Sequence, residues 1–389
     1  MKPYRKTEIS FYLFQSFRMA YFYLPILVIY LSNTVSLFQA SILVSVKDVV
    51  VFLLEVPTGF VADSYGRKRS MQFGLLFCII SLGIFSLFKS FILFFVAEIF
   101  FGVSEALISG ADDAWLYDDL DFLGVKDHYP VVLQKISQFQ YFVLLLAYII
   151  GPNLYAINSV LPFKISLLFL ILAFVICASC KEYTHIQEHI NSDQKLKHTF
   201  LRITDTDSRC WAILIEGNLI IGIIMALYSY IIPLLLQRTV ETSRIGFIYS
   251  GCMVIISFLV GFSGKIKSYL KNSYHFMPPV LAIISACLCL IWFRSVSVVI
   301  FMVAIRLACG WFSIMYNIDL NNAITDSKIR ATMTSIGNGV CSIITALLTI
   351  IYGMLADRIP LVYLCICSGI LMLVIVMIYS GIKTSLDKS

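Results

Sequence analysis

Charged side chains stand inside several long apolar segments of this 389-residue chain. A charge in the middle of a bilayer costs about 2.5–3.5 kcal/mol even on a lenient insertion scale, so such residues normally face a charged partner or a wet cavity. They are therefore candidates for binding a polar substrate group or for carrying a proton. The candidate residues are Arg18, Lys47, Asp48, Glu55, Glu98, Glu105, Glu216 and Arg306.

The acidic residues follow a helical spacing. Glu98, Glu105 and Asp112 are seven residues apart, and so are Asp48 and Glu55, which predicts that each set lies on one face of a helix. A carboxylate in such a position could bind a proton when a cavity opens around it. The alternative is a static role, in which paired charges hold the helices together.

The elements that position these residues are predicted from hydropathy. The composition is 59% hydrophobic and only 13% charged, whereas soluble domains carry about a quarter charged residues. A membrane span needs about 20 apolar residues, and such stretches recur along the whole chain. We predict an all-α polytopic membrane protein with six spans in residues 1–180, a cytoplasmic linker at 181–209 and six spans in 210–389. The spans are expected near 9–32, 36–61, 70–88, 91–111, 136–157, 162–180, 210–236, 244–263, 276–293, 296–316, 331–355 and 361–382.

The basic residues predict the orientation. Connections on one side of the expected spans hold 20 Lys and Arg residues, and those on the other side hold six. Because positively charged loops are retained on the cytoplasmic side, both termini are expected inside the cell. The first span is too long for a removable signal peptide and is expected to stay as a helix. Basic residues scattered over short connections also argue against a nucleic-acid partner.

The two halves resemble each other weakly, as parallel repeats. A turn with Asn158 and Pro162 follows the fifth span, and a turn with Asp357 and Pro360 follows the eleventh. Two parallel halves are one of the known plans of transporters, in which the substrate site lies near mid-membrane between the repeats.

The connection between the second and third spans reads EVPTGFVADSYGRKRS. This segment resembles the signature Gly-x-x-x-Asp-x-x-Gly-Arg-Lys-x-Arg of the major facilitator superfamily. Its small residues suit close helix approach and a tight turn, and its acid can accept charge-assisted hydrogen bonds. In the family this cluster is thought to stabilise the outward-open state, so we call it the conformational latch. Its residues are Gly59, Asp63, Gly66, Arg67, Lys68 and Arg69.

Further segments extend the resemblance over essentially the whole chain. SGADDAWLYDDL and KIRATMTSIGN look like recurrent segments of bacterial facilitator exporters. YIIGPNLYA carries the Gly151-Pro152 pair of the antiporter signature, with Ala147, Tyr155 and Ala156 where the signature has glycine.

The resemblance also implies places for the buried charges. In this fold helices 1, 4, 7 and 10 line the central cavity, which would bring Arg18, Glu98, Glu105, Glu216 and Arg306 toward a shared space. Glu98 stands where many facilitator antiporters carry an arginine, and Arg306 occupies the matching place in helix 10. We hypothesise that Glu98 or Glu105 carries a proton. Arg306 would be its switchable partner, or an anchor for an anionic substrate group.

The predicted function is therefore export of a small amphipathic molecule, such as a drug, antibiotic or siderophore, from a bacterial cell by proton-coupled alternating access. The alternatives are an importer of a nutrient or siderophore-type compound and a non-transporting membrane sensor. We find no catalytic cluster, no phosphate-binding Gly-rich loop and no zinc-site spacing among the eleven cysteines, so neither an enzyme nor a metal site is expected. The expected energy source is a proton or other ion gradient without a cofactor. The expected state is a monomer in the bacterial inner membrane.

Overall fold

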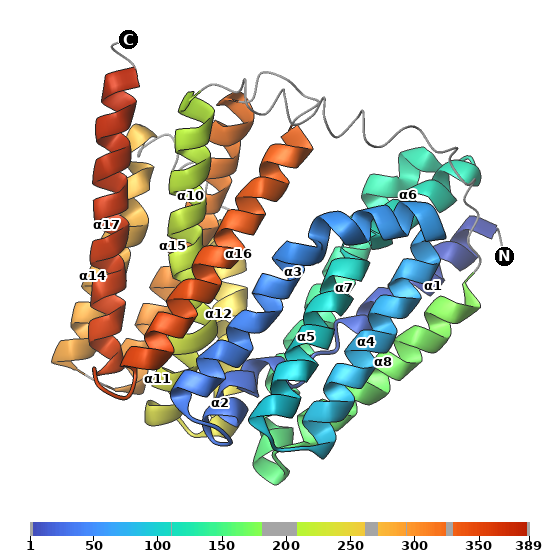
Figure 1. The fold of residues 1–389 in the computed structure, drawn as a ribbon, viewed down its shortest axis with the longest axis horizontal. Coiled ribbons are helices and arrows are strands. Elements are labelled where there is room, and N and C mark those ends of the chain that lie inside the picture. The colour runs from blue at the N-terminus through green and yellow to red at the C-terminus, as the bar shows by residue number, and fades with distance from the viewer. Residues whose placement is uncertain are drawn as a thin grey trace. The chain divides into compact units, whose positions relative to one another are not determined.

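The computed structural model describes residues 3–109, 111–180, 208–260, 271–292, 294–323 and 330–386 (Figure 1). Within these ranges every regular element is a helix, and no strand occurs. Helices are expected because lipid offers no hydrogen-bond partner, so each backbone N–H and C=O must be satisfied inside its own segment. The predicted linker at 181–209 lies outside the described residues, except for its last two positions, which begin a helix.

The chain divides into two compact units, which we call unit 1 and unit 2. Unit 1 comprises Met1–Gln187 with Glu241–Ser250, and unit 2 comprises Glu188–Val240 with Gly251–Ser389. The helices of unit 1 are α1 (Pro3–Arg18), η1 (Leu24–Ile26), α2 (Leu27–Ser32), α3 (Leu37–Tyr65), α4 (Arg67–Leu87), α5 (Phe91–Ile108), α6 (Ala111–Phe122), η2 (Lys126–His128), α7 (Tyr129–Ile157) and α8 (Leu161–Ser179). The helices of unit 2 are α10 (Ser208–Ala226), η3 (Leu227–Ile231), α11 (Ile232–Thr239), η4 (Lys271–Phe276), α14 (Met277–Ile291), α15 (Ser295–Ala323), α16 (Arg330–Leu355) and α17 (Leu361–Leu386). Helix α12 (Thr242–Val260) begins in unit 1 and ends in unit 2.

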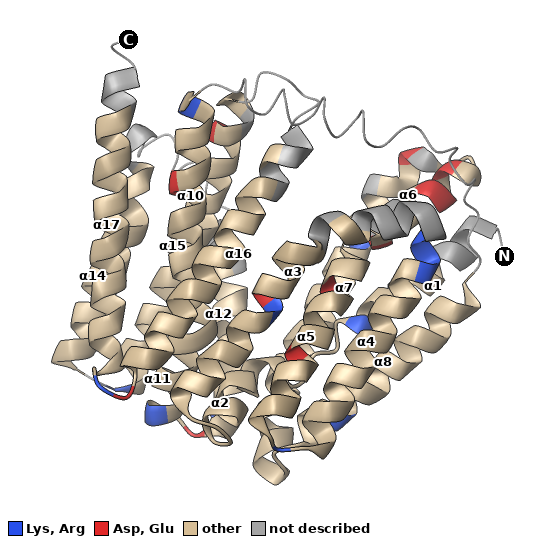
Figure 2. Cartoon of the chain, in the orientation of Figure 1, with Lys and Arg blue, Asp and Glu red and all other residues tan. Residues whose placement is uncertain are grey.

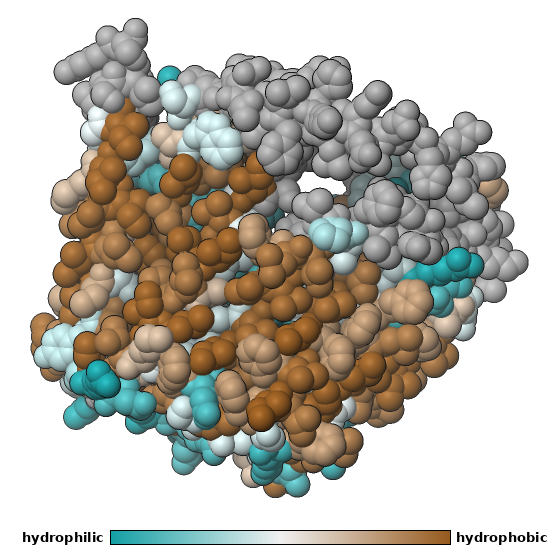
Figure 3. Space-filling model, in the orientation of Figure 1, coloured by the Kyte–Doolittle hydropathy of each residue, from teal (hydrophilic) through white to brown (hydrophobic). Residues whose placement is uncertain are grey.

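Ten of the described helical segments are long and apolar enough to cross a membrane, and Thr242–Ile256 is a shorter apolar helix. The all-α, multi-pass prediction is confirmed, whereas the count of twelve spans stays a prediction. Large apolar side chains such as Leu87, Ile157 and Ile291 are 74%, 77% and 84% exposed. Figure 3 shows such apolar surface covering the visible flanks of the helices, and Figure 2 shows charges gathered mainly toward helix ends. A surface of this kind suits lipid rather than water.

The first predicted span, 9–32, is not one helix. Helix α1 ends at Arg18, and a turn leads to η1 and α2. Pro25 stands in η1, and a proline lacks the N–H that a continuous helix would pair with the carbonyl four residues earlier. Hydropathy does not predict this break, because the residues on both sides of it are apolar.

The break is covered by two other helices of unit 1. The backbone N–H of Phe22 donates to Ser166 Oγ of α8 at 2.9 Å, which satisfies a donor that the helix no longer pairs. On α7, a Cβ on Gly151 would lie 2.0 Å from the carbonyl oxygen of Phe22. Gly151, from the Gly-Pro pair that resembles the antiporter signature, therefore lets α7 approach the broken backbone.

In unit 2, α10 packs against α15, α16 and α17, and α14 packs against α15 and α17. Asn218 of α10 donates to the Tyr316 hydroxyl of α15 at 2.6 Å. The adjacent Gly217 leaves room for the Tyr316 ring, which a Cβ there would approach to 2.1 Å. Polar contacts between buried faces thus supplement apolar packing in this unit.

We expect Gly151→Ala to destabilise the protein by about 1–3 kcal/mol, because its methyl group meets backbone rather than a flexible side chain. Thermal unfolding of the purified chain in detergent measures the change. Gly83→Ala is the matched control, because Gly83 lies inside α4 with nothing within 4 Å of the added methyl, and alanine favours the helix there. Equal melting temperatures for the two variants would contradict the assigned close approach.

Candidate substrate and ion pathway

Two acids lie on one face of α5. Glu98 is 4% exposed and Glu105 is partly buried, and their seven-residue spacing places them two turns apart. The predicted row does not continue to Asp112 within the same helix. Helix α5 ends at Ile108, Ser109 adopts a ψ of 122°, and Asp112 belongs to α6. A local backbone turn, rather than side-chain chemistry, removes Asp112 from the row.

The α3 residues Lys47 and Asp48 form an ion pair, with Lys47 Nζ 3.2 Å from Asp48 Oδ1. Lys47 also interacts electrostatically with Glu98 and Glu105 of α5. We call these four residues the unit 1 charge cluster. It holds one cation and three carboxylates within predicted membrane spans.

A glycine allows the two helices of this cluster to come together. A Cβ on Gly102 of α5 would lie 2.7 Å from Val50 Cβ and 3.0 Å from the carbonyl oxygen of Lys47. Because Gly102 is one turn from Glu98 and three residues from Glu105, the close approach occurs where the charges interact.

Aromatic rings adjoin the cluster at the break of the first span. Tyr21 and Tyr23 each make an edge contact with Phe101 of α5. Tyr21 also interacts with Glu105. Such rings could contact an apolar part of a substrate, although both tyrosines are mostly buried.

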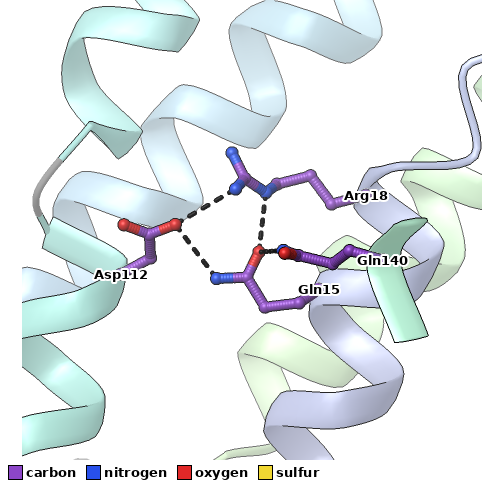
Figure 4. A network of polar contacts seen from close by, with 4 residues as sticks. All are labelled: Gln15, Arg18, Asp112 and Gln140. Carbon is purple, nitrogen blue, oxygen red and sulfur yellow. Dashed lines mark hydrogen bonds and ion pairs between the residues drawn. The ribbon is translucent and has the colours of Figure 1, made fainter. Parts of the chain in front are cut away.

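Arg18 is held in a buried polar network (Figure 4). Its Nη2 lies 3.1 Å from Asp112 Oδ2, and its Nε donates to Gln15 Oε1 at 3.0 Å. Gln15 also donates to Asp112 and accepts from Gln140 of α7. The network ties α1 to α6 and α7, which is the static kind of role that the sequence left open for each charge.

The described residues of the conformational latch contact other residues of unit 1. Gly66 has a φ of 96°, a left-handed conformation that favours glycine, and it separates α3 from α4. Arg67 Nη1 lies 2.5 Å from Asp118 Oδ2 of α6, and Lys68 donates to the carbonyl of Ala178 near the end of α8 at 2.9 Å. Arg69 follows on the same turn and is exposed. The side chains of Glu55, Gly59 and Asp63 lie outside the described residues.

The Gly151-Pro152 pair of α7 also adjoins the start of α12. A Cβ on Gly246 would lie 2.1 Å from the Tyr148 carbonyl oxygen and 3.0 Å from the Pro152 ring. The Tyr148 and Tyr249 rings meet edge to face. Glycine and proline here form a close helix contact, consistent with a packing role for the signature.

In unit 2, Glu216 of α10 is only 3% exposed and pairs with His275 of η4, with Oε1 and Nδ1 2.8 Å apart. The neighbouring Tyr274 donates to Asp319 of α15 at 2.6 Å. These contacts join α10, η4 and α15 through buried polar groups. The structure thus places Glu216 against a histidine of its own unit.

Arg306 of α15 lies over the ring of Tyr228, with its guanidinium carbon 5.1 Å from the ring centroid. Tyr228 belongs to η3, a short π-helical stretch within the candidate span Ser208–Thr239. Arg306 is partly buried. The predicted pairing of Glu98 with Arg306 joins residues of different units and stays a prediction.

Sequence reasoning missed the partners of several candidates, namely Gln15, Gln140, Asp118, Tyr228 and His275. A buried arginine signals that some acid must come near, but spacing along the chain does not identify that acid. His275 was detectable only as a titratable residue at the edge of an apolar run.

Comparison with known proteins identifies the family. The family model described as "Major Facilitator Superfamily" matches residues 9–342. This chain belongs to the major facilitator superfamily. It is therefore a membrane transporter by family and not an enzyme, as the sequence predicted.

Individual members of the superfamily resemble the chain over nearly its full length. The uncharacterized MFS-type transporter YxaM of Bacillus subtilis (strain 168) is 23% identical over 371 residues, covering 92% of this chain and 90% of that one. The structure is similar to that of the nucleoside transporter NupG (D323A mutant), with a TM-score of 0.81, 13% identity, and 97% and 99% of the two chains covered. It is also similar to the POT family transporter PepTSo, with a TM-score of 0.72, 10% identity, and 100% and 99% covered. At these identities the two structures show the facilitator fold alone.

We expect Asp112→Asn to destabilise this facilitator by about 3–5 kcal/mol, because it leaves the buried Arg18 without its counter-charge. The measurement is the melting temperature of the detergent-solubilised protein. Asp127→Asn, an exposed acid in η2, is the matched control and should leave the melting temperature unchanged. A variant Asp112→Asn that melts like the parent would show that the network does not stabilise unit 1.

Proposed function

We propose that this facilitator exports a small amphipathic molecule from a bacterial cell by proton-coupled alternating access. It would act as a monomer in the inner membrane, with both termini in the cytoplasm and without a cofactor. The observation that supports the proposal is the unit 1 charge cluster, in which the buried Glu98 lies near one lysine and two other carboxylates.

The charge balance of the cluster favours cation binding. Lys47 pairs with Asp48 at 3.2 Å, and Arg18, which interacts with Glu105 from outside the cluster, is itself paired with Asp112. The carboxylates here therefore outnumber the cations. A carboxylate without a counter-charge is costly inside a membrane span. Binding of a proton or another cation would therefore stabilise these carboxylates. Binding on one side and release on the other would couple that cation to transport.

The export direction rests on the resemblance of SGADDAWLYDDL and KIRATMTSIGN to segments of bacterial facilitator exporters. Import of a nutrient or siderophore-type compound is the alternative, since the same fold occurs in proteins described as nucleoside and peptide transporters. A non-transporting sensor is the third outcome of the experiment below.

Accumulation of fluorescein, an amphipathic anion, and ethidium, an amphipathic cation, should be measured in cells with and without the chain. Export predicts lower accumulation of at least one dye, and a protonophore should abolish the difference. Higher accumulation would indicate import, and an unchanged level of both dyes would contradict the proposed export.

The proton role is tested with Glu98→Gln and Glu105→Gln, which keep side-chain size and remove the charge. At least one variant should lose most protonophore-sensitive transport while keeping its expression level. Glu241→Gln is the matched control, because Glu241 is largely exposed and pairs locally with Arg244. If both cluster variants retain full pH-driven transport, neither acid is the proton carrier.

A further inference from the structure

Arg306 places a positive charge within an apolar helix, where a charge is energetically costly. It lies within the apolar stretch Ser295–Leu320, which is long enough to cross a membrane, and it is neither fully buried nor at a helix end. A cation at such a depth normally has an anionic partner or faces a water-filled cavity.

No acid of unit 2 pairs with Arg306 among the residues that the structure describes. Glu216 is engaged by His275, and Asp319 accepts a hydrogen bond from Tyr274. Asp357 is exposed in the turn between α16 and α17. The guanidinium therefore has no counter-charge within the described part of its own unit.

The guanidinium carbon of Arg306 lies over the Tyr228 ring, 5.1 Å from its centroid. A cation over an aromatic face is attracted by the ring quadrupole. Arginine carries five N–H donors, and an aromatic ring accepts none of them as a charged partner would, so the contact with Tyr228 leaves donors for an anion.

The backbone presents Tyr228 in an unusual way. The π-helical stretch Leu227–Ile231 precedes Pro233, which cannot donate a helical hydrogen bond. Tyr228 and Ser229 are partly exposed, whereas Tyr230 and Ile231 are fully buried. Such π-bulges occur frequently at functional sites, and this one holds the ring that supports Arg306.

We propose that Arg306 and Tyr228 form an anion-binding subsite for the transported molecule, and that the substrate is an amphipathic organic anion such as an aromatic carboxylate. This inference rests on the proposed transport function. The forked guanidinium matches the two oxygens of a carboxylate, and Tyr228 supplies an aromatic surface beside it.

The subsite is tested by ligand-induced stabilisation of the full chain in detergent. Benzoate and benzamide are the probes, because they share the ring and differ in charge. Benzoate at about ten times its Kd should raise the apparent Tm by about 2–4 °C, and benzamide by much less. Equal shifts, or none with benzoate, would overturn the proposal.

Variants of Arg306 and Tyr228 test whether benzoate binds at this subsite. Arg306→Gln should abolish the difference between the probes, and Arg306→Lys should keep part of it, because the charge remains while the fork is lost. Tyr228→Phe should retain the shift and Tyr228→Leu should reduce it. A benzoate-specific shift that persists undiminished in Arg306→Gln would place the anion elsewhere. If Arg306→Gln does not fold, Arg306→Lys decides, since an undiminished shift there excludes a forked contact.

Arg294→Gln is the matched control. Arg294 also lies over an aromatic ring, with its guanidinium carbon 5.5 Å from the centroid of Trp292, but it is exposed and lies in the connection before α15. The benzoate shift should be unchanged in this variant. Benzoate-selective binding lost in Arg306→Gln, together with no dye transport in cells, would refute the transport function while leaving the anion subsite intact.

Discussion

The absence of water from the interior of a bilayer is the constraint on which this structure depends. It demands that backbone groups be satisfied within each helix and that each buried charge be matched by a neighbour. The long apolar helices meet the first demand. Arg18 with Asp112, Lys47 with Asp48, and Glu216 with His275 meet the second. These pairs lie in both units, so polar contacts organise each bundle as well as the candidate pathway.

The charges nevertheless divide into two kinds. Arg18 is enclosed by Gln15 and Asp112, which are themselves engaged, and such a closed network rigidifies its surroundings. The unit 1 charge cluster and Arg306 differ, because the first has more acids than bases and the second has no acid partner in the described part of unit 2. A side chain whose charge is only partly compensated can exchange partners, whereas one whose charge is fully compensated holds helices in place.

The sequence predicted the all-helical class and the family because both depend on signals local in the chain, namely apolar length and the loop around Gly66. It also placed most candidate charges on the correct helices. It did not predict the break before Pro25, because hydropathy averages over that turn. The sequence also did not predict that Asp112 lies outside α5. The seven-residue spacing was extended across Ser109, where the helix ends. Partners such as Asp118 and His275 come from distant segments, and only tertiary packing brings them to Arg67 and Glu216.

The break gives unit 1 a joint inside the first predicted span. Helix α1 packs against α7 and α8, whereas α2 packs against α3. A continuous helix would transmit a tilt at one end to the other as a rigid lever. With the turn between Arg18 and Leu24, each segment can follow its own neighbours, so α1 and α2 need not move together.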